Sequence, residues 1–285
     1  MEDGSLGIDS RNLIPGIILC DGSIMKGRIF MKNLFDLSGK VALITGASSG
    51  LGVQFANVLA DFGADVIILA RRADKLENVA KEIKAKGRKA LPLTCDVTKE
   101  EEVISAVEKG IKEFGKIDIL INNAGLGAVT PAEEYDFGEW KKMIDINLNA
   151  VFFMAQQVGK EMIKNKYGKI INIASMYGIK ANMALPTTAY HASKAGVVNL
   201  TRALAAEWAK HNITVNAIGP GFFQSEMTTD ALGDESFLQH IKLTTPMGRY
   251  GNAGELDGIV IYLASDASSY TTGQTIAVDG GTTAV

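Results

Sequence analysis

A regular alternation of short apolar runs with longer amphipathic segments constrains the fold of this chain more than any other feature. The runs are rich in Val and Ile and barely alternate between apolar and polar residues, as strands buried on both faces do. Seven strands are predicted, at Val41–Thr45, Asp65–Ala70, Ala90–Cys95, Ile117–Ile121, Lys169–Ala174, Ile213–Ile218 and Gln274–Val278. Helices are predicted between them, at Leu51–Phe62, Asp74–Lys86, Lys99–Phe114, Phe137–Lys164, Ala189–Lys210 and Ala253–Ala264. The alternation predicts an α/β fold with one seven-stranded parallel sheet, wound right-handedly, and helices on both faces.

The chain divides into an extension and one large domain. Residues 1–36 precede the first strand, and the first 30 are rich in Gly, Asp and Ser. We expect residues 1–36 to be a poorly ordered N-terminal extension, with a docked or swapped arm as the alternative. A secretory signal would begin with basic residues, whereas this end carries Glu2 and Asp3. Residues 37–285 are predicted to form the domain, with an irregular, mobile flap at about 221–245.

Composition excludes several classes of function. The formal net charge is −3 and no dense basic block is present, so we expect neither nucleic acid nor a membrane surface as partner. No run of about 18 apolar residues exists to span a bilayer. The cysteines Cys20 and Cys95 are too few for a disulfide framework and lack metal-ligand spacing, so no metal site is predicted. A cytoplasmic location is the expectation.

A glycine-rich turn follows the first predicted strand and opens the first predicted helix. It spans Thr45–Gly52 and reads Thr-Gly-Ala-Ser-Ser-Gly-Leu-Gly. Glycines in this context allow a tight turn and a close approach of the backbone to a pyrophosphate at the helix N-terminus. The turn therefore predicts a dinucleotide site, with a purely structural turn as the alternative. The predicted contacts are Gly46, Ser48, Ser49, Gly50, Leu51 and Gly52.

The end of the second predicted strand indicates which dinucleotide is used. Enzymes that use NAD commonly place an acidic residue there for the ribose 2′-hydroxyl. This chain instead has Arg71 and Arg72 after Ala70. A guanidinium can bind a 2′-phosphate through two parallel hydrogen bonds and can stack on adenine. The sequence predicts NADP(H), with Arg71 as the main phosphate ligand and Ser48 assisting; a solvated basic helix start is the alternative.

A tyrosine and a lysine four residues apart are the candidate proton-transfer pair. Tyr190 and Lys194 lie on the same face of one predicted helix, and Ser175 precedes them. An ammonium beside a phenol favours the phenolate, which moves the pKa of tyrosine from about 10 toward neutrality. Such a pair can exchange a proton with an alcohol or a carbonyl, although the spacing alone is a weak motif.

Taken together, these motifs resemble those of the short-chain dehydrogenase/reductase family, over essentially residues 37–285. The glycine turn and the Tyr190–Lys194 pair are accompanied by further matches in the family's order. These are Asp96-Val97, Asn122–Gly125, Asn147, Ser175, Pro220-Gly221, Ser225 and Val278–Gly281. The resemblance implies a Rossmann fold and hydride transfer between NADP(H) and a small carbonyl or alcohol substrate.

The resemblance also implies roles for individual residues. Tyr190 would give a proton to the developing alkoxide, and Ser175 would donate a hydrogen bond to the same oxygen. Lys194 would lower the pKa of Tyr190 and hold the nicotinamide ribose, and Asn147 would hold a water that connects Lys194 to solvent. The implied cofactor contacts are Gly46, Ser48, Ser49, Gly50, Leu51, Gly52, Arg71, Arg72, Asp96, Val97, Asn123, Ala124, Gly125, Tyr190, Lys194, Pro220, Gly221, Phe222 and Ser225.

One departure from the family pattern concerns the substrate end. Ser175 and Tyr190 are fifteen residues apart, slightly further than is usual in the family. The extra residues, within 180–188, are expected to bulge at the pocket mouth and to affect substrate shape. Candidate pocket residues are Gly127, Met176, Tyr177, His191, Phe222, Phe223 and Met227.

Three functions stay open at this point. Residues 35–40, 220–228 and 272–282 resemble gluconate 5-dehydrogenase-type members, which favours a sugar, polyol or sugar-acid substrate. A 3-oxoacyl-[acyl-carrier-protein] reductase is the alternative; Lys164, Lys166 and Lys169 could dock an acidic carrier, but Ala206 stands where those reductases commonly have arginine. A non-catalytic dinucleotide-binding scaffold is the third. The resemblance further implies a homotetramer built from the helices around 140–164 and 192–210 and from the C-terminal strand.

Overall fold

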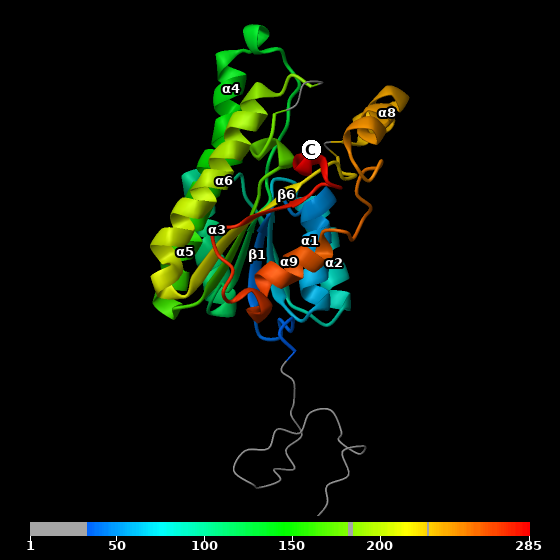
Figure 1. Cartoon of the computed structure of the whole chain (residues 1–285). Helices are drawn as coiled ribbons and strands as arrows, with labels where there is room; N and C mark the ends of the chain where they lie inside the picture. Colours follow the sequence, from blue (N-terminus) through cyan, green and yellow to red (C-terminus); the bar gives the residue numbers. More distant parts are fainter. Residues whose placement is uncertain (1–32, 182–184, 227) are drawn as a thin grey trace, which may run out of the picture. The chain divides into compact units, whose positions relative to one another are not determined.

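Within the described residues, seven parallel strands form one sheet in the computed structural model of the chain (Figure 1). They are β1 (Val41–Thr45), β2 (Asp65–Ala70), β3 (Ala90–Thr94), β4 (Ile119–Asn122), β5 (Gly168–Ile173), β6 (Ile213–Pro220) and β7 (Thr275–Val278). Their order in space is β3-β2-β1-β4-β5-β6-β7, and every neighbouring pair is parallel. Each strand lies on a predicted apolar run, so the predicted α/β fold is confirmed.

The structure describes residues 33–181, 185–226 and 228–285. Residues 34–285 form one compact unit. Of the predicted N-terminal extension, residues 1–36, all but the last four lie outside the described residues. Its order therefore stays a prediction.

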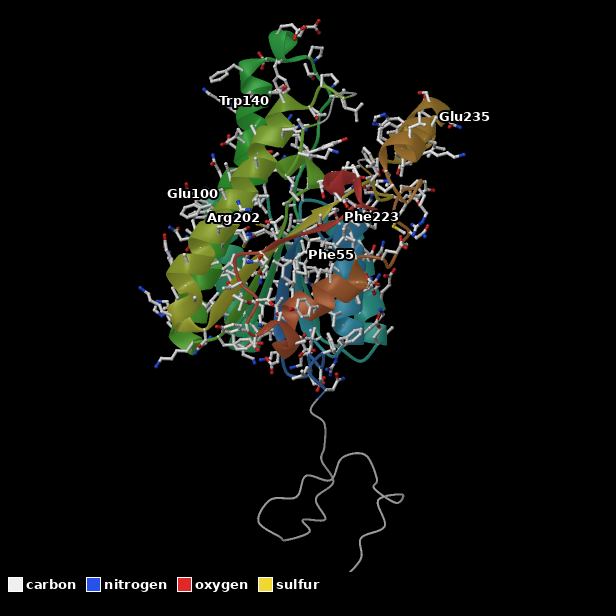
Figure 2. All side chains as sticks on the ribbon, viewed as in Figure 1. Phe55, Glu100, Trp140, Arg202, Phe223 and Glu235 are labelled. Atoms are coloured by element: carbon white, nitrogen blue, oxygen red, sulfur yellow. The ribbon has the colours of Figure 1, made fainter. Side chains whose placement is uncertain are left out.

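Two helical layers cover the sheet, and the strand pleat explains why both faces are apolar. Successive side chains of a strand point to opposite faces. Ala42 and Ile44 accordingly belong to one buried cluster, and Val41 and Leu43 to another. The first cluster packs against α1 (Gly50–Asp61), α2 (Ala73–Ala85) and α9 (Asp257–Ala264), and includes Phe55, labelled in Figure 2. The second packs against α3 (Glu100–Phe114), α5 (Ala150–Asn165) and α6 (Thr188–Trp208).

The direction of winding reverses between β1 and β4. The chain adds β2 and β3 on one side of β1, and then returns to add β4 on the other side. Loops leaving the carboxyl ends of these two central strands diverge, which opens a crevice for a ligand. Thr45 joins the two strand ends, because its Oγ1 accepts hydrogen bonds from the backbone N–H groups of Asn123 and Ala124, both at 3.0 Å.

The single helix predicted over Phe137–Lys164 is interrupted, and this part of the prediction is wrong. Helix α4 (Phe137–Ile144) passes through a π-helical turn at Asp145–Asn149 before α5 begins. A π turn holds one residue more than an α turn, so it changes which side chain faces the interior. Asn147 is fully buried there.

The flap predicted at about 221–245 is more regular than expected. It contains α7 (Thr229–Leu232) and α8 (Glu235–Thr244), whose exposed first turn carries Glu235 (Figure 2). Asp234 caps α8 by accepting a hydrogen bond from the backbone N–H of Phe237 at 2.9 Å. The segment is anchored where the N–H of Gly221 donates to the Val278 carbonyl at 2.9 Å. Its mobility stays a prediction. Among the residues described, none of the helices could cross a membrane and no group of side chains could hold a metal ion.

Candidate active site

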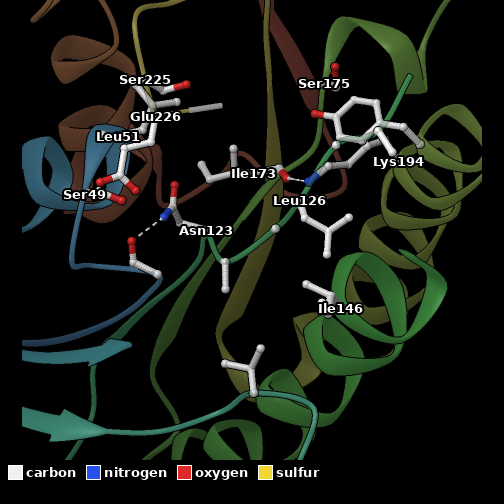
Figure 3. A pocket seen from close by; sticks show the side chains of 18 of the residues that line it. Ser49, Leu51, Asn123, Leu126, Ile146, Ile173, Ser175, Lys194, Ser225 and Glu226 are labelled. Atoms are coloured by element: carbon white, nitrogen blue, oxygen red, sulfur yellow. Dashed lines mark hydrogen bonds between the residues drawn. The ribbon is translucent and has the colours of Figure 1, made fainter. Parts of the chain in front are cut away.

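A groove of about 950 Å³ lies at the carboxyl ends of the strands (Figure 3). It is lined by the glycine turn, by the segments that follow the strands, and by residues of α4 and α6. The structure brings nearly all of the predicted site residues together in this one groove. Those that line it are Gly46, Ser48, Ser49, Gly50, Leu51, Arg71, Arg72, Asp96, Val97, Asn123, Ala124, Gly125, Ser175, Tyr190, Lys194, Pro220, Gly221, Phe222 and Ser225. Gly52 and Asn147 do not line it, and both lie just behind it.

The neighbours of the glycine turn pack too closely for side chains at Gly46 and Gly52. A Cβ on Gly52 would lie 2.2 Å from the carbonyl oxygen of Gly46, so Gly52 lets α1 pack against the turn. Gly46 has φ +67°, which favours glycine. The Asn123 amide fixes the turn from the side by donating to the carbonyls of Thr45 at 3.0 Å and Gly46 at 3.3 Å. No side chain caps the first turn of α1, so its N–H groups are available to an anion.

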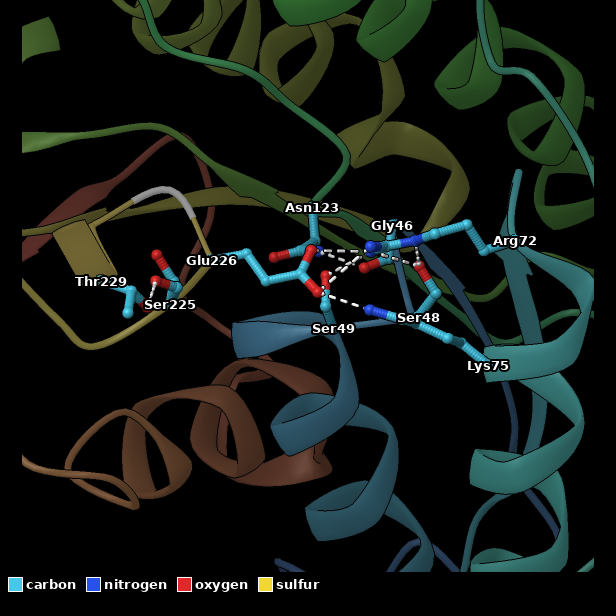
Figure 4. Close-up of polar contacts among 9 residues, drawn as sticks. All are labelled: Gly46, Ser48, Ser49, Arg72, Lys75, Asn123, Ser225, Glu226 and Thr229. Carbon is cyan, nitrogen blue, oxygen red and sulfur yellow. Dashed lines mark hydrogen bonds and ion pairs between the residues drawn. The ribbon is translucent and has the colours of Figure 1, made fainter.

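A cluster of hydrogen-bond donors lies beside the turn. The guanidinium of Arg72 donates to Ser48 Oγ at 3.0 Å and to Ser49 Oγ at 2.8 Å. It also forms an ion pair with Glu226 at 2.8 Å, and Glu226 binds Lys75 Nζ at 2.7 Å (Figure 4). Sequence reasoning named Arg71 as the main phosphate ligand, but Arg72 is the arginine that holds the two serines. The role of Arg71 stays a prediction.

Arg71 lies instead on the side of the groove where Asp96 is found. Burial alone would raise the pKa of Asp96, but hydrogen bonds from Thr98 and the charge of Arg71 lower it overall. Thr98 donates to Asp96 Oδ1 through its backbone N–H at 3.0 Å and its hydroxyl at 2.7 Å. Asp96 is therefore an ionised, fixed side chain at the end of β3, where the resemblance predicts a contact with adenine.

Ser175 and Tyr190 meet across the groove from different elements. Ser175 follows β5 and begins a short 3₁₀ turn, where its Oγ accepts a hydrogen bond from the Tyr177 N–H at 3.1 Å. This contact uses a lone pair of the hydroxyl and leaves its proton to be donated. Tyr190 lies in the first turn of α6, and the Ser175 hydroxyl lies close enough to its phenol to lower the phenol's pKa.

Lys194 is one helical turn further along α6 and is almost fully buried, with 4% of its surface exposed. Its Nζ donates to the Ile173 carbonyl at 2.8 Å (Figure 3) and lies 5.6 Å from the centre of the Tyr190 ring. Burial lowers the pKa of Lys194 to about 8. An ammonium with this pKa can lose and regain its proton near neutral pH.

The electrostatic effect on Tyr190 differs from the sequence expectation. Burial raises the pKa of the phenol, and the hydrogen bond from Ser175 opposes this rise only in part. Lys194, whose ammonium is hydrogen-bonded to the Ile173 carbonyl, is not among the groups that shift the pKa of Tyr190 here. Lowering of the Tyr190 pKa by Lys194 therefore stays a prediction for the working enzyme.

Asn147 acts on the groove through the backbone. Its Nδ2 donates to the Leu126 carbonyl and its Oδ1 accepts from the Leu126 N–H, both at 2.9 Å. This reciprocal pair fixes the loop after β4, whose members Gly125 and Leu126 line the groove. The π-helical turn directs the amide toward that loop. The predicted water held by Asn147 is not tested by these contacts.

Aromatic rings define the expected substrate end. Tyr177 stacks on His191 with ring centres 4.7 Å apart, and meets Tyr190 and Phe222 edge-to-face at 6.5 Å and 6.1 Å. Tyr177 and Phe222 line the groove, as do the predicted Gly127, Met176 and Phe223. His191 does not, and its Nδ1 lies 2.9 Å from the Thr187 carbonyl. Met227 and part of the predicted bulge at 180–188 lie outside the described residues.

The groove and its donors agree with the family that the sequence comparison identifies. The sequence model of the short chain dehydrogenase family matches residues 40–236. The chain belongs to this family. Its relatives include the gluconate 5-dehydrogenase of Gluconobacter oxydans, 42% identical over 252 residues, or 88% of this chain and 97% of the relative. The 2-dehydro-3-deoxy-D-gluconate 5-dehydrogenase of Dickeya dadantii is 44% identical over 250 residues, 87% of this chain and 97% of the relative.

A solved structure extends the likeness to three dimensions. The crystal structure of a gluconate 5-dehydrogenase from Burkholderia cenocepacia in complex with NADP and tartrate superimposes with a TM-score of 0.85. It is 36% identical, and the match covers 88% of this chain and 98% of that one. The predicted family, the Rossmann-like fold and the assignment as a dehydrogenase/reductase are therefore confirmed.

Sequence reasoning missed two residues of the charged cluster. Lys75 lies in the first turn of α2, three residues after Arg72 at the N-cap of that helix, so its spacing could have identified it. Glu226 is 154 residues from Arg72, and no local pattern connects them.

Proposed function

We propose that this dehydrogenase interconverts a secondary alcohol and a ketone with NADP(H), on a sugar acid such as gluconate and 5-ketogluconate. The convergence of Ser175, Tyr190 and Lys194 on the groove that holds the glycine turn carries the proposal. The names of the relatives from Gluconobacter, Dickeya and Burkholderia support the substrate class, and the NADP complex supports the cofactor.

The residues of the groove fit NADP(H). The Gly46–Gly52 turn and the uncapped start of α1 suit a pyrophosphate. Arg72, Lys75 and Ser48 supply cationic and hydroxyl donors for a 2′-phosphate, with Arg71 beside them. NADP(H), when bound, supplies or accepts the hydride.

The chain's own residues handle the proton and the substrate oxygen. In the reducing direction Tyr190 delivers its phenolic proton to the oxygen that gains charge. Ser175 donates a hydrogen bond to that oxygen and orients it. After this step Tyr190 is a phenolate. The buried Lys194, whose pKa is about 8, stabilises this phenolate and returns a proton to it.

A screen of NADPH oxidation tests the proposal. We expect turnover with 5-ketogluconate or a related keto-sugar acid, and a lower rate with simple diketones. The same rates measured with NADH report the cofactor preference. Activity confined to an acetoacetyl thioester would replace the sugar-acid assignment with the acyl-carrier reductase, and no turnover on any carbonyl would leave the scaffold alternative.

Homotetramer formation and a cytoplasmic location are part of the same proposal. The tetramer rests on the family resemblance, and the location is the default for a chain with too few cysteines for a disulfide framework. Light scattering of the purified protein tests the first, and a monomer would contradict it.

A further inference from the structure

The cationic cluster beside the glycine turn, Arg72 and Lys75, binds an anion, and in this structure the anion is the carboxylate of Glu226. Arg72 and Glu226 meet in a fork, with Nη1–Oε1 at 3.1 Å and Nη2–Oε2 at 2.8 Å. Lys75 Nζ binds the same carboxylate at 2.7 Å, and the nearby Ser49 hydroxyl also lowers the pKa of Glu226. Figure 4 shows Glu226 reaching these three donors from the opposite side of the groove.

Glu226 belongs to a part of the chain remote from its partners. It lies between β6 and α7, in the segment that also contributes Phe222 and Ser225 to the groove. Arg72 and Lys75 lie at the start of α2, and Ser49 is in the glycine turn. The ion pairs therefore cross the groove, and Glu226 itself lines it.

The geometry of the donors suits a phosphate at least as well as a carboxylate. A planar guanidinium can bind two phosphate oxygens through parallel hydrogen bonds, and an ammonium and a hydroxyl can bind a third. A phosphate monoester carries nearly two charges near pH 7, against one for Glu226. Several contacts, of which the hydrogen bonds from Arg72 have the largest effect, lower the pKa of Glu226 to about 2. The carboxylate therefore stays ionised at neutral pH.

We propose that Glu226 is a specificity-determining residue that competes with the 2′-phosphate of the cofactor for Arg72 and Lys75. This inference rests on the proposed NADP(H) site and adds a residue that acts against it. A cofactor with a 2′-phosphate displaces the carboxylate from both cations. A cofactor without that phosphate leaves the ion pairs in place. Glu226 therefore weakens the binding of NADPH but not of NADH, and so reduces the preference of the protein for NADPH over NADH.

Calorimetric titration with two adenosine fragments isolates this effect from catalysis. The fragments are 2′,5′-ADP, which carries the 2′-phosphate, and 5′-ADP, which does not. Glu226→Gln keeps the size of the side chain and removes its charge. An exposed ion pair changes an equilibrium constant by less than about fivefold, and two pairs are broken here. We expect Glu226→Gln to tighten 2′,5′-ADP binding by about three- to tenfold and to leave 5′-ADP binding unchanged.

Two further variants make the result specific. Glu235→Gln removes an exposed charge from the start of α8, outside the lining of the groove, and is expected to change neither constant. In an Arg72→Ala background, Glu226→Gln is expected to change the binding of 2′,5′-ADP less than in the wild type, because one of the two contested cations is missing.

The inference and the proposed function fail in different ways. Equal changes for both fragments, or no change for 2′,5′-ADP, in a protein that prefers 2′,5′-ADP would overturn the role of Glu226. If neither the wild type nor Glu226→Gln prefers 2′,5′-ADP over 5′-ADP, the proposed NADP(H) preference is wrong.

Discussion

Replacing Lys194 by methionine should make the protein more stable and nearly inactive. The Lys194 ammonium is 4% exposed, and burial lowers its pKa from 10.5 to about 8. A difference of this size corresponds to about 3 kcal/mol of unfavourable free energy for the charged form. Methionine keeps the aliphatic stem and removes the charge, but it leaves the Ile173 carbonyl without its donor, at a cost of about 1 kcal/mol. The net gain expected for Lys194→Met at pH 7 is about 2 kcal/mol.

The pH dependence of this gain distinguishes burial of a charge from better packing. At pH 7 the native protein carries the buried ammonium and bears the full penalty. Between about pH 8 and 10.5 the native protein loses this proton before the unfolded chain does, so the unfolded state binds more protons and wild-type stability rises. The advantage of Lys194→Met over the wild type should therefore shrink across this window and reverse above it, where only the cost of about 1 kcal/mol for the lost Ile173 hydrogen bond is left.

Urea unfolding of both proteins without cofactor, at one protein concentration, measures the difference at pH 7 and pH 10. Tyr190→Phe is the control, because it disables the same site but keeps the buried ammonium. If Lys194→Met is less stable than the wild type at pH 7, or if its advantage is the same at pH 10, the buried lysine does not bear the calculated penalty.

Three further substitutions test the site. Tyr190→Phe should lower kcat by about 10²- to 10⁴-fold through loss of the proton donor, while NADPH binding, followed by fluorescence, is kept; a near wild-type rate would refute the proposed mechanism. Arg72→Ala should lower the ratio of kcat/KM for NADPH over NADH by about 10-fold or more, and by more than Arg71→Ala does; the reverse order would restore Arg71 as the main ligand. Gly52→Ala places a Cβ 2.2 Å from the carbonyl oxygen of Gly46, and should lower the free energy of unfolding by about 1–3 kcal/mol and weaken NADPH binding. Gly258→Ala is the control: its Cβ would meet nothing within 4 Å, so thermal unfolding should show a neutral or stabilising effect.

Local patterns in the sequence were sufficient to predict the sheet and most of the residues that line the groove. The seven apolar runs predicted the strands because a strand covered on both faces must be apolar in nearly every position. The Thr45–Gly52 turn and the Tyr190–Lys194 spacing are likewise short-range, since each depends on residues within one turn or one helix. Their order along the chain places them all at the carboxyl ends of parallel strands.

Packing decided what no short segment could specify. Asn147, in the π-helical turn, is hydrogen-bonded to Leu126, a partner 21 residues away that only the folded chain brings near. The pKa of Lys194 is set by burial beneath the groove rather than by its neighbours in sequence. Sequence reasoning placed the lysine beside the phenol but did not include its bond to Ile173.

The charged cluster beside the glycine turn also depends partly on local sequence and partly on tertiary structure. Arg71 and Arg72 could be named as candidate cofactor ligands from their place after β2, because that place is defined by strand order alone. The partner of Arg72, Glu226, comes from a segment 154 residues away, brought across the groove by the whole sheet. Electrostatic interactions depend on distance in space rather than along the chain. The sequence by itself therefore determined that arginine and serine donors follow the first two strands, and only the tertiary structure added Lys75 to them and decided which acid competes for them.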